Sequence, residues 1–211
     1  MATYTAAEDS SAGSLTIGKG PTGSTVTSLT DNPLSPGRHT GSGDCFSAAF
    51  RFTGVTETGT ITSATFSMVA STSYTTANPI IYVVSCQAAD SAGVLTSTSG
   101  DINATTRPRT TADSGNWDVR SVTAGTRYSI DITSAVQEVL NRGGWASGNA
   151  IVVLVDTSTG STVDNEWQDW RAVDDPGTGN EAQLAITAGG GTTLRERGTF
   201  RGVLRGVGRG I

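Results

Sequence analysis

The sequence predicts an all-β fold: a jelly-roll β-sandwich with one short helix at about residues 134–141 and an extended C-terminal arm. About nine short segments alternate polar and apolar residues or are apolar throughout, as strands are. Clusters of Gly, Ser, Thr, Asp and Pro separate these segments, which is typical of turns between short strands. An Arg-Gly repeat follows the glycines at 189–191. We therefore expect a sandwich domain at residues 1–188 and a glycine hinge with an arm at residues 189–211.

Three segments have the clearest strand patterns. Phe46, Phe50 and Phe52 fall on one face of the segment 45–52, and this period of two is typical of a half-buried strand. The apolar run in Pro79–Cys86 predicts a central strand covered on both faces, and Asn149–Val155 holds the strongest apolar run. The other expected strands are Ser14–Ile17, Thr25–Leu29, Thr62–Ala70, Trp117–Val119, Arg127–Asp131, Glu166–Val173 and Gln183–Thr187.

One segment has the periodicity of an amphipathic helix, from about Ser134 to Asn141. Ser134 and Gln137 have the spacing of a capping box, in which each side chain would satisfy a backbone amide of the first turn. Gly143 and the glycine after it predict the end of the helix. Trp145 is expected to fold back onto it. The apolar residues at helical spacing are Ile132, Val136, Val139 and Leu140.

Charge is distributed unevenly along the chain. Residues 1–191 hold nine cationic and eighteen acidic residues, a net charge of −9, whereas residues 192–211 have a net charge of +4. An acidic body would repel phosphate, so we expect no nucleic-acid partner for it. No segment approaches the roughly 20 apolar residues of a membrane span, and the first residues lack the basic and apolar regions of a signal peptide. We therefore expect no membrane partner.

The arm repeats Arg-Gly every four residues from Arg197 to Arg209. In an extended strand the arginines would line one face, while Phe200 and Leu204 would project from a nearly bare opposite face. Such a strip could lie on another subunit or extend the edge of its sheet. The predicted partner-binding residues are Arg197, Phe200, Arg201, Leu204, Arg205 and Arg209.

Two other interpretations of the arm stay open. A terminal segment rich in glycine can be a disordered, solvated tail. An arginine–glycine segment can also bind RNA. The RNA interpretation is weaker here, because aromatic residues are scarce and RGG triplets are absent.

The residue types of common catalytic and metal sites are scarce. His39 is the only histidine, and it lies in an expected loop (residues 31–43) without a nucleophile motif, so we predict a solvated residue. No cysteine–histidine pattern fits zinc, and Cys45 and Cys86 are expected to be buried small hydrophobic residues rather than a disulfide, although a bridge stays open. We predict no catalytic residue, no cofactor and no metal, and hence no enzyme.

A group of carboxylates in the second half is expected to form a solvated acidic face. A glycosidase pair or a calcium site would use the same residue types, but no spacing here is diagnostic of either. The group consists of Asp164, Glu166, Asp169, Asp174, Asp175 and Glu181.

Three tryptophans near turns have two possible roles. Trp145, Trp167 and Trp170 could offer aromatic faces to a sugar, or they could pack under loops. In a strand, Trp167 and Trp170 would point to opposite faces, so both could not form one platform. Packing is the favoured interpretation.

Several segments, taken in order, resemble the DNRLRE-type, carbohydrate-binding-module-like jelly-roll domains. The similarity covers about residues 44–188, and the helix–Gly–Trp segment is its most specific part. The segments are Thr58–Phe66 (TGTITSATF), Asn116–Asp118, Thr123–Tyr128, Asp131–Gly148 (DITSAVQEVLNRGGWASG), Ala150–Val155 and Ala182–Thr187. The resemblance implies a jelly roll and carries over no catalytic residue.

The resemblance also implies two settings. Members in secreted, polysaccharide-active proteins have signal peptides and neighbouring domains, which this sequence does not display. Similar domains look to be used on tailed-phage virions, including as head-decoration proteins, and a short chain with an arm fits that setting better.

The leading hypothesis is a non-enzymatic phage virion structural protein, a capsid decoration or cement protein on the capsid surface. It would be a homo-oligomer, for instance a trimer, attached by its arm to the major capsid protein or to other virion subunits. The alternative is a carbohydrate-binding module of a secreted or host-adsorption protein of a tail or fibre. That module would bind a host surface glycan through Trp145, Trp167 or Trp170.

Overall fold

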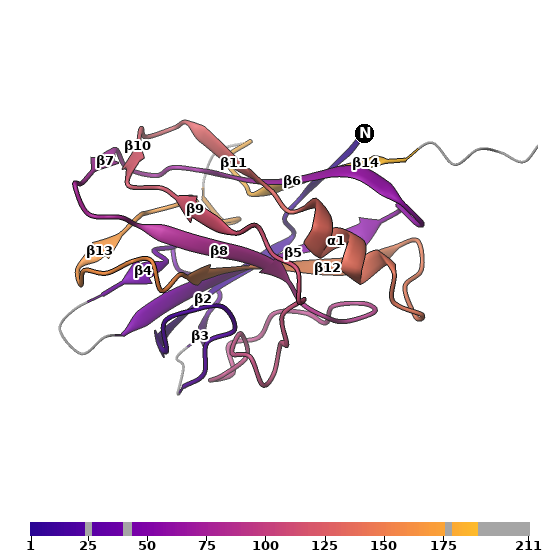
Figure 1. Ribbon diagram of the computed structural model, residues 1–211, viewed down its shortest axis with the longest axis horizontal. Coiled ribbons are helices and arrows are strands. Elements are labelled where there is room, and N and C mark those ends of the chain that lie inside the picture. Colours follow the sequence, from indigo (N-terminus) through magenta and orange to yellow (C-terminus); the bar gives the residue numbers. More distant parts are fainter. Residues whose placement is uncertain (24–26, 40–43, 176–178, 190–211) are drawn as a thin grey trace, which may run out of the picture.

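Two antiparallel β-sheets face each other in the computed structural model, which describes residues 1–23, 27–39, 44–175 and 179–189 (Figure 1). The all-β, jelly-roll-like sandwich fold is thereby confirmed. The smaller sheet has the strand order β1 (Ala2–Thr5), β14 (Gln183–Ala188), β6 (Ile61–Val69) and β11 (Arg127–Asp131). The predicted glycine hinge and arm lie outside the described residues from residue 190 onward.

The larger sheet is built around β5 (Cys45–Val55). On one side, β5 pairs with β12 (Asn149–Thr157), followed by β8 (Ile81–Cys86) and β9 (Asn116–Asp118). It also pairs with β2 (Glu8–Leu15), which pairs with β3 (Thr27–Ser28). The short strand β4 (Gly37–Arg38) joins the first residues of β5 and carries β13 (Glu166–Trp167). A separate ribbon pairs β7 (Tyr74–Thr75) with β10 (Ser121–Val122).

Aromatic side chains fill the space between the sheets. The rings of Phe50 and Phe52 on β5 lie 5.4 and 6.3 Å from the ring of Phe66 on β6, centroid to centroid. All three side chains are fully buried. The phenylalanines alternate with other residues in β5 because one face of the strand points into the core, as predicted.

The larger sheet is also covered on its outer face, by a loop of residues 87–115 that we call the covering loop. Val152 and Leu154 on β12 point to this face, whereas Val153 belongs to the core between the sheets. A strand buried on both faces needs apolar residues at successive positions, which explains the run at the centre of β12. The outer cluster consists of Ala12, Leu15, Ala49, Ala92, Leu95, Ile102, Val152 and Leu154.

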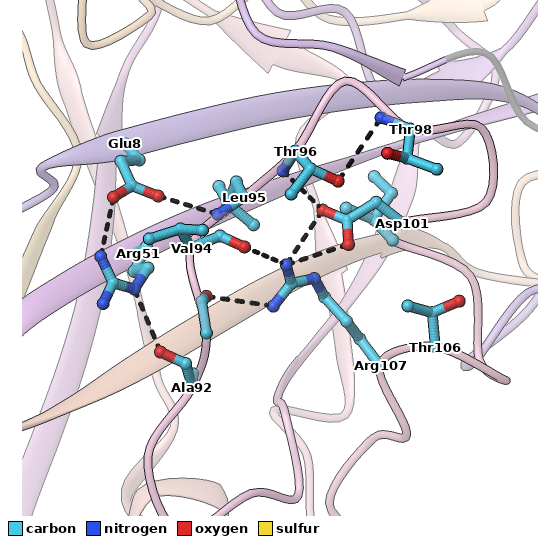
Figure 2. Close-up of polar contacts among 12 residues, drawn as sticks. Glu8, Arg51, Ala92, Val94, Leu95, Thr96, Thr98, Asp101, Thr106 and Arg107 are labelled. Atoms are coloured by element: carbon cyan, nitrogen blue, oxygen red, sulfur yellow. Dashed lines mark hydrogen bonds and ion pairs between the residues drawn. The ribbon is translucent and has the colours of Figure 1, made fainter.

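Two arginines fasten the first part of the covering loop (Figure 2). Arg107 donates to both oxygens of Asp101, at 3.0 and 2.9 Å, and to the carbonyl oxygen of Val94 at 2.6 Å. Arg51 on β5 donates to Glu8 at 2.7 Å and to the carbonyl oxygen of Ala92 at 3.1 Å. These contacts fix loop backbone that the sheets themselves do not pair.

A buried ion pair ties the end of the covering loop to the centre of the larger sheet. Arg109 Nε and Nη2 donate to the two carboxylate oxygens of Asp156 on β12, at 3.0 and 2.8 Å. The side chains are 3% and 0% exposed. Arg109 also donates to the carbonyl oxygen of Ile102 at 2.8 Å, and the amide of Gly20 donates to Asp156 at 3.1 Å. The pair is thus well hydrogen-bonded, which a buried ion pair requires to be tolerated.

The helix α1 (Thr133–Leu140) lies within one residue of its predicted bounds and packs against β6 and β8 (Figure 1). The predicted capping box is wrong, because the N-cap residue is Ile132 and no side chain caps it. Gln137 instead accepts a hydrogen bond from the amide of Ile61 at 2.8 Å and donates to the carbonyl oxygen of Gly59 at 3.0 Å. Its amide therefore joins α1 to the start of β6.

Other boundaries differ where the residues are polar. Most of β2 lies before the expected strand Ser14–Ile17, and β13 has only two residues of the expected Glu166–Val173. The expected loop at residues 31–43 contains β4. The segment Arg127–Asp131 forms β11 with its predicted bounds.

We expect Asp156→Ala to destabilise the protein by about 3–5 kcal/mol, because Arg109 would be left as a buried, uncompensated charge. Chemical denaturation would measure the change. The matched control is Arg142→Ala, since the Arg142–Asp90 pair is 38% and 49% exposed and should contribute little. Equal effects of the two substitutions would contradict the structural importance of the buried pair.

Candidate functional site

A pocket of about 220 Å³ opens beside β13, and we call it the aromatic pocket. It combines an indole and a phenol with hydroxyl, amide and carboxylate groups. Its lining consists of Thr72, Tyr74, Asn165, Trp167 and Asp169. Asn165 has a φ of 64°, a left-handed conformation that asparagine tolerates better than most residues. It makes the turn into β13.

Close backbone packing positions Trp167 at this pocket. Gly37 pairs with Trp167 across β4 and β13 and has a φ of 144°. A Cβ atom at Gly37 would lie 2.5 Å from the Trp167 Cβ, so a glycine is required there. The His39 ring stacks on the indole, with centroids 4.3 Å apart and an interplanar angle of 17°.

His39 itself is half-buried, so the prediction of a solvated loop histidine is wrong. Its Nε2 lies 2.8 Å from the carbonyl oxygen of Ser35. Its ring also lies 4.3 Å from that of Phe46. The short strand β4, which the sequence did not reveal, places the ring between these aromatic neighbours.

Glu166 holds Tyr74 in place from below the surface. Tyr74 donates to its carboxylate at 2.8 Å, Thr76 at 3.0 Å and the Asn78 amide at 2.7 Å. Burial acts to raise the pKa of Glu166, but the hydrogen bonds from Asn78, Tyr74 and Thr76 outweigh it and lower the pKa. Glu166 is therefore a carboxylate that orders the pocket wall.

The expected solvated acidic face is not present, because most of its members are bound to neighbouring side chains. Asp164 pairs with Arg38 at 2.5 Å, Asp175 pairs with Arg171 at 2.5 Å, and Ser35 donates to Asp169 at 2.6 Å. Among the six predicted carboxylates, Asp174 is the one classed as exposed.

The three predicted tryptophans have different environments. Trp170 is 0% exposed and donates to the hydroxyl of Tyr82 at 3.2 Å, so a ligand cannot reach it. Trp145 packs against the core and donates to the carbonyl oxygen of Glu57 at 2.9 Å. Of the three, Trp167 lines a pocket, together with Tyr74, which the sequence analysis did not single out.

A second pocket, of about 190 Å³, lies where β1 leads into β2, and we call it the acidic pocket. Its walls include the apolar side chains of Leu29, Leu95 and Val173, and its carboxylates are Glu8, Asp9 and Asp174. Asp9 is 4% exposed and accepts a hydrogen bond from the amide of Val173. The pocket has no signal in the sequence, because its residues come from four segments that are far apart in the chain.

Burial raises the pKa of Asp9 to about 6, against the lowering effect of the Val173 amide. Asp174 and Asp31 raise it further, since both are acidic neighbours. Neither Asp9 nor Asp174 has an ion-pair partner among the described residues. The third carboxylate of the pocket, that of Glu8, is paired with Arg51.

The described part of the chain uses its own cations internally. It holds nine cationic side chains, and eight of them form an ion pair with a carboxylate. The ninth, Arg127, donates to the carbonyl oxygens of Ser67, Gly179 and Glu181. Because this part of the chain contains eighteen carboxylates, ten have no ion-pair partner within it.

The remaining predicted sites have simple outcomes. Cys45 and Cys86 are buried thiols, as favoured, and burial raises the pKa of Cys86 to about 12. Within the described residues, no three His, Cys, Asp or Glu side chains are grouped to hold a metal ion. No helix in the same residues is long and apolar enough to cross a bilayer. The predicted arm residues Arg197, Phe200, Arg201, Leu204, Arg205 and Arg209 lie outside the described residues.

The described residues define an all-β, jelly-roll-like sandwich with a polar–aromatic pocket and an acidic pocket. The chain matches no model of a known protein family and no curated protein. The resemblance to DNRLRE-type domains therefore stays a prediction.

Asp9→Asn should remove a pH dependence of stability. The folded protein holds the Asp9 proton up to about pH 6, whereas the unfolded chain releases it near the ordinary value of 3.8. Folding stability therefore falls as pH rises between these values, and at pH 7 the variant should be more stable by about 1–3 kcal/mol. Chemical denaturation from pH 4 to pH 8 would measure it, with exposed Asp174→Asn as the weaker comparison. Parallel curves for wild type and Asp9→Asn would show that Asp9 is not the group responsible.

Proposed function

We propose that this protein is a non-enzymatic structural protein of a tailed-bacteriophage particle, a capsid decoration or cement protein. Its sandwich would be displayed on the capsid surface, and its C-terminal arm would attach it to the major capsid protein or to other virion subunits. A homo-oligomer, such as a trimer, is part of the proposal. The resemblance noted in the sequence supports this setting.

The observation that carries the proposal is the fixed origin of the arm. The last strand, β14, is an inner strand that pairs with β1 on one side and β6 on the other. The amide of Gly189 donates to the carbonyl oxygen of Thr60 at 2.8 Å, so backbone order extends to the first residue of the predicted hinge. The arm sequence therefore begins at a rigid point of the sandwich, as a tether between two bodies must.

Charge supports the same role. The cations of the body are occupied within the body, whereas residues 192–211 bring five arginines and one glutamate. Arginine pairs strongly with carboxylates through two parallel hydrogen bonds, and apolar side chains such as those of Phe200 and Leu204 would add affinity on burial at an interface. An arm of this composition suits attachment to an acidic protein surface.

Deleting residues 190–211 should leave the unfolding temperature of the body nearly unchanged and abolish its incorporation into particles. Replacing the four repeated arginines, Arg197, Arg201, Arg205 and Arg209, with glutamine should have the same effect, because the charge is lost. Quantitative mass spectrometry of purified virions would measure the copy number. Full occupancy of the truncated protein on particles would refute the arm as the attachment element.

A second candidate function, glycan binding, is favoured by the aromatic pocket. Sugar sites combine an aromatic face with a few convergent polar groups, and here Trp167 and Tyr74 lie beside Thr72, Asn165 and Asp169. The pocket is smaller than the roughly 300–1,000 Å³ of drug-sized sites, which suits one sugar ring. This function would serve a host-adsorption or secreted protein, and it is compatible with a place on a virion.

For this candidate, Trp167→Ala should weaken binding to a glycan identified on an array by about tenfold or more, as for a hot-spot residue. Trp145→Phe is the matched control, because Trp145 lies against the core and does not line the pocket. An array on which the wild-type protein binds no glycan, or binding that survives Trp167→Ala, would exclude this site.

A further inference from the structure

We infer that the acidic pocket is the docking site for an arginine from the arm of a second copy of this chain. The candidate side chains are Arg197, Arg201, Arg205 and Arg209. This inference rests on the proposed assembly role of the arm and names one of its binding sites. Its basis is the lining of the pocket, the distribution of cations and the position of the two ends of β14.

The lining of the pocket suits an arginine side chain. Leu29, Leu95 and Val173 form apolar walls that can cover the methylene groups of the stem. Asp9 and Asp174 supply carboxylates for the guanidinium, which presents five donors in a planar fork. A small neutral ligand would leave the charge of these carboxylates uncompensated.

The chemistry of the pocket points to a missing cation. Asp9 is almost fully buried, and its hydrogen bond from a described residue comes from the Val173 amide. Asp31, a further acidic neighbour, accepts from the hydroxyl of Ser11 and has no ion-pair partner among the described residues. Arg51 cannot turn to this cluster, because it is bound to Glu8 and Ala92. Asp9, Asp31 and Asp174 thus leave negative charge at this pocket that no cation of the described residues pairs with.

The arm is the part of this chain that can supply the cation. The body arginines and the lysine are occupied, as described above, whereas residues 192–211 carry a net charge of +4. Each repeated arginine is followed by glycine, which allows the backbone to approach a pocket mouth closely. The repeat also carries a guanidinium group at four positions, so the pocket has four candidate arginines to bind.

The geometry of β14 favours the arm of a second copy over the arm of the same copy. At its start, Gln183 pairs with Thr5, and the chain continues from Thr5 into the pocket residues Ala7 to Asp9. At its end, Ala188 pairs with Ile61, on the side of the molecule where α1 lies (Figure 1). Six strand residues span about 20 Å. The described end of β14 therefore lies about 20 Å from the end of the strand that leads to the pocket of the same copy.

The full-length protein allows a direct test by sedimentation velocity at pH 7. The wild type should self-associate with a salt-sensitive dissociation constant, and the double variant Asp9→Asn/Asp174→Asn should weaken association about tenfold or more. Neutralising the four repeated arginines should weaken it to the same extent, and combining both sets should add little further. Asp131→Asn is the matched control, because it removes an exposed charge elsewhere and should change nothing.

A synthetic peptide of residues 192–211 provides an independent measurement. It should compete with self-association of the wild-type protein and bind the double variant at least about tenfold more weakly. If arginine neutralisation abolishes association or particle incorporation while the pocket variant behaves as wild type, the pocket inference is overturned and the proposed function stands. A protein that stays monomeric at every concentration also overturns the inference. If neutralising the arginines reduces neither self-association nor particle incorporation, the pocket inference and the proposed function are both overturned.

Discussion

The buried ion pair between Arg109 and Asp156 is the constraint on which the two-sided burial of the larger sheet depends. Asp156 stands on β12, and Arg109 stands at the end of the covering loop. Arg109 also binds the carbonyl oxygen of Ile102, whose side chain packs in the outer cluster with Val152 and Leu154. The sandwich thus obtains its second apolar layer from an irregular loop, and side chains supply the hydrogen bonds that strands would normally supply.

The same loop shapes the acidic pocket. Leu95 lies in its wall, and the amide of Leu95 donates to Glu8 at 2.8 Å. Glu8 in turn binds Arg51, whose other hydrogen bond reaches Ala92 (Figure 2). The loop is thus held by Arg51 and Glu8, and Asp9 has no ion-pair partner among the described residues. The Arg51–Glu8 pair at the edge of the pocket and the unpaired carboxylate of Asp9 inside it therefore both result from the way the covering loop is held.

Sequence periodicity was sufficient for the elements with an apolar face, and insufficient where polar atoms determine the structure. The segment Arg127–Asp131 and the apolar run of β12 were predicted because burial requires those residue types. Strands β1 and β2 are rich in Ser, Thr and Ala, so their pairing shows in no periodicity. Gln137 and Glu166 act through hydrogen bonds, and His39 through a ring stack, with residues far away in the sequence. A single sequence does not reveal those partners.

The candidate sites follow from this distinction. A tryptophan in a sequence can be a ligand platform or part of a core, and only packing distinguishes Trp167, which lines a pocket, from Trp170, which is enclosed by Tyr82 and Trp117. Charged residues differ from tryptophans in this respect. The amino-acid composition fixes the net charge, whereas the fold determines which charges pair with one another. The sandwich pairs eight of its nine cations with its own carboxylates, which leaves ten carboxylates without an ion pair among the described residues, including Asp9 and Asp174 of the acidic pocket. In the proposed assembly, the arginines of the terminal arm and the unpaired carboxylates of the sandwich would be the two partners of one interaction, made between copies or with other subunits.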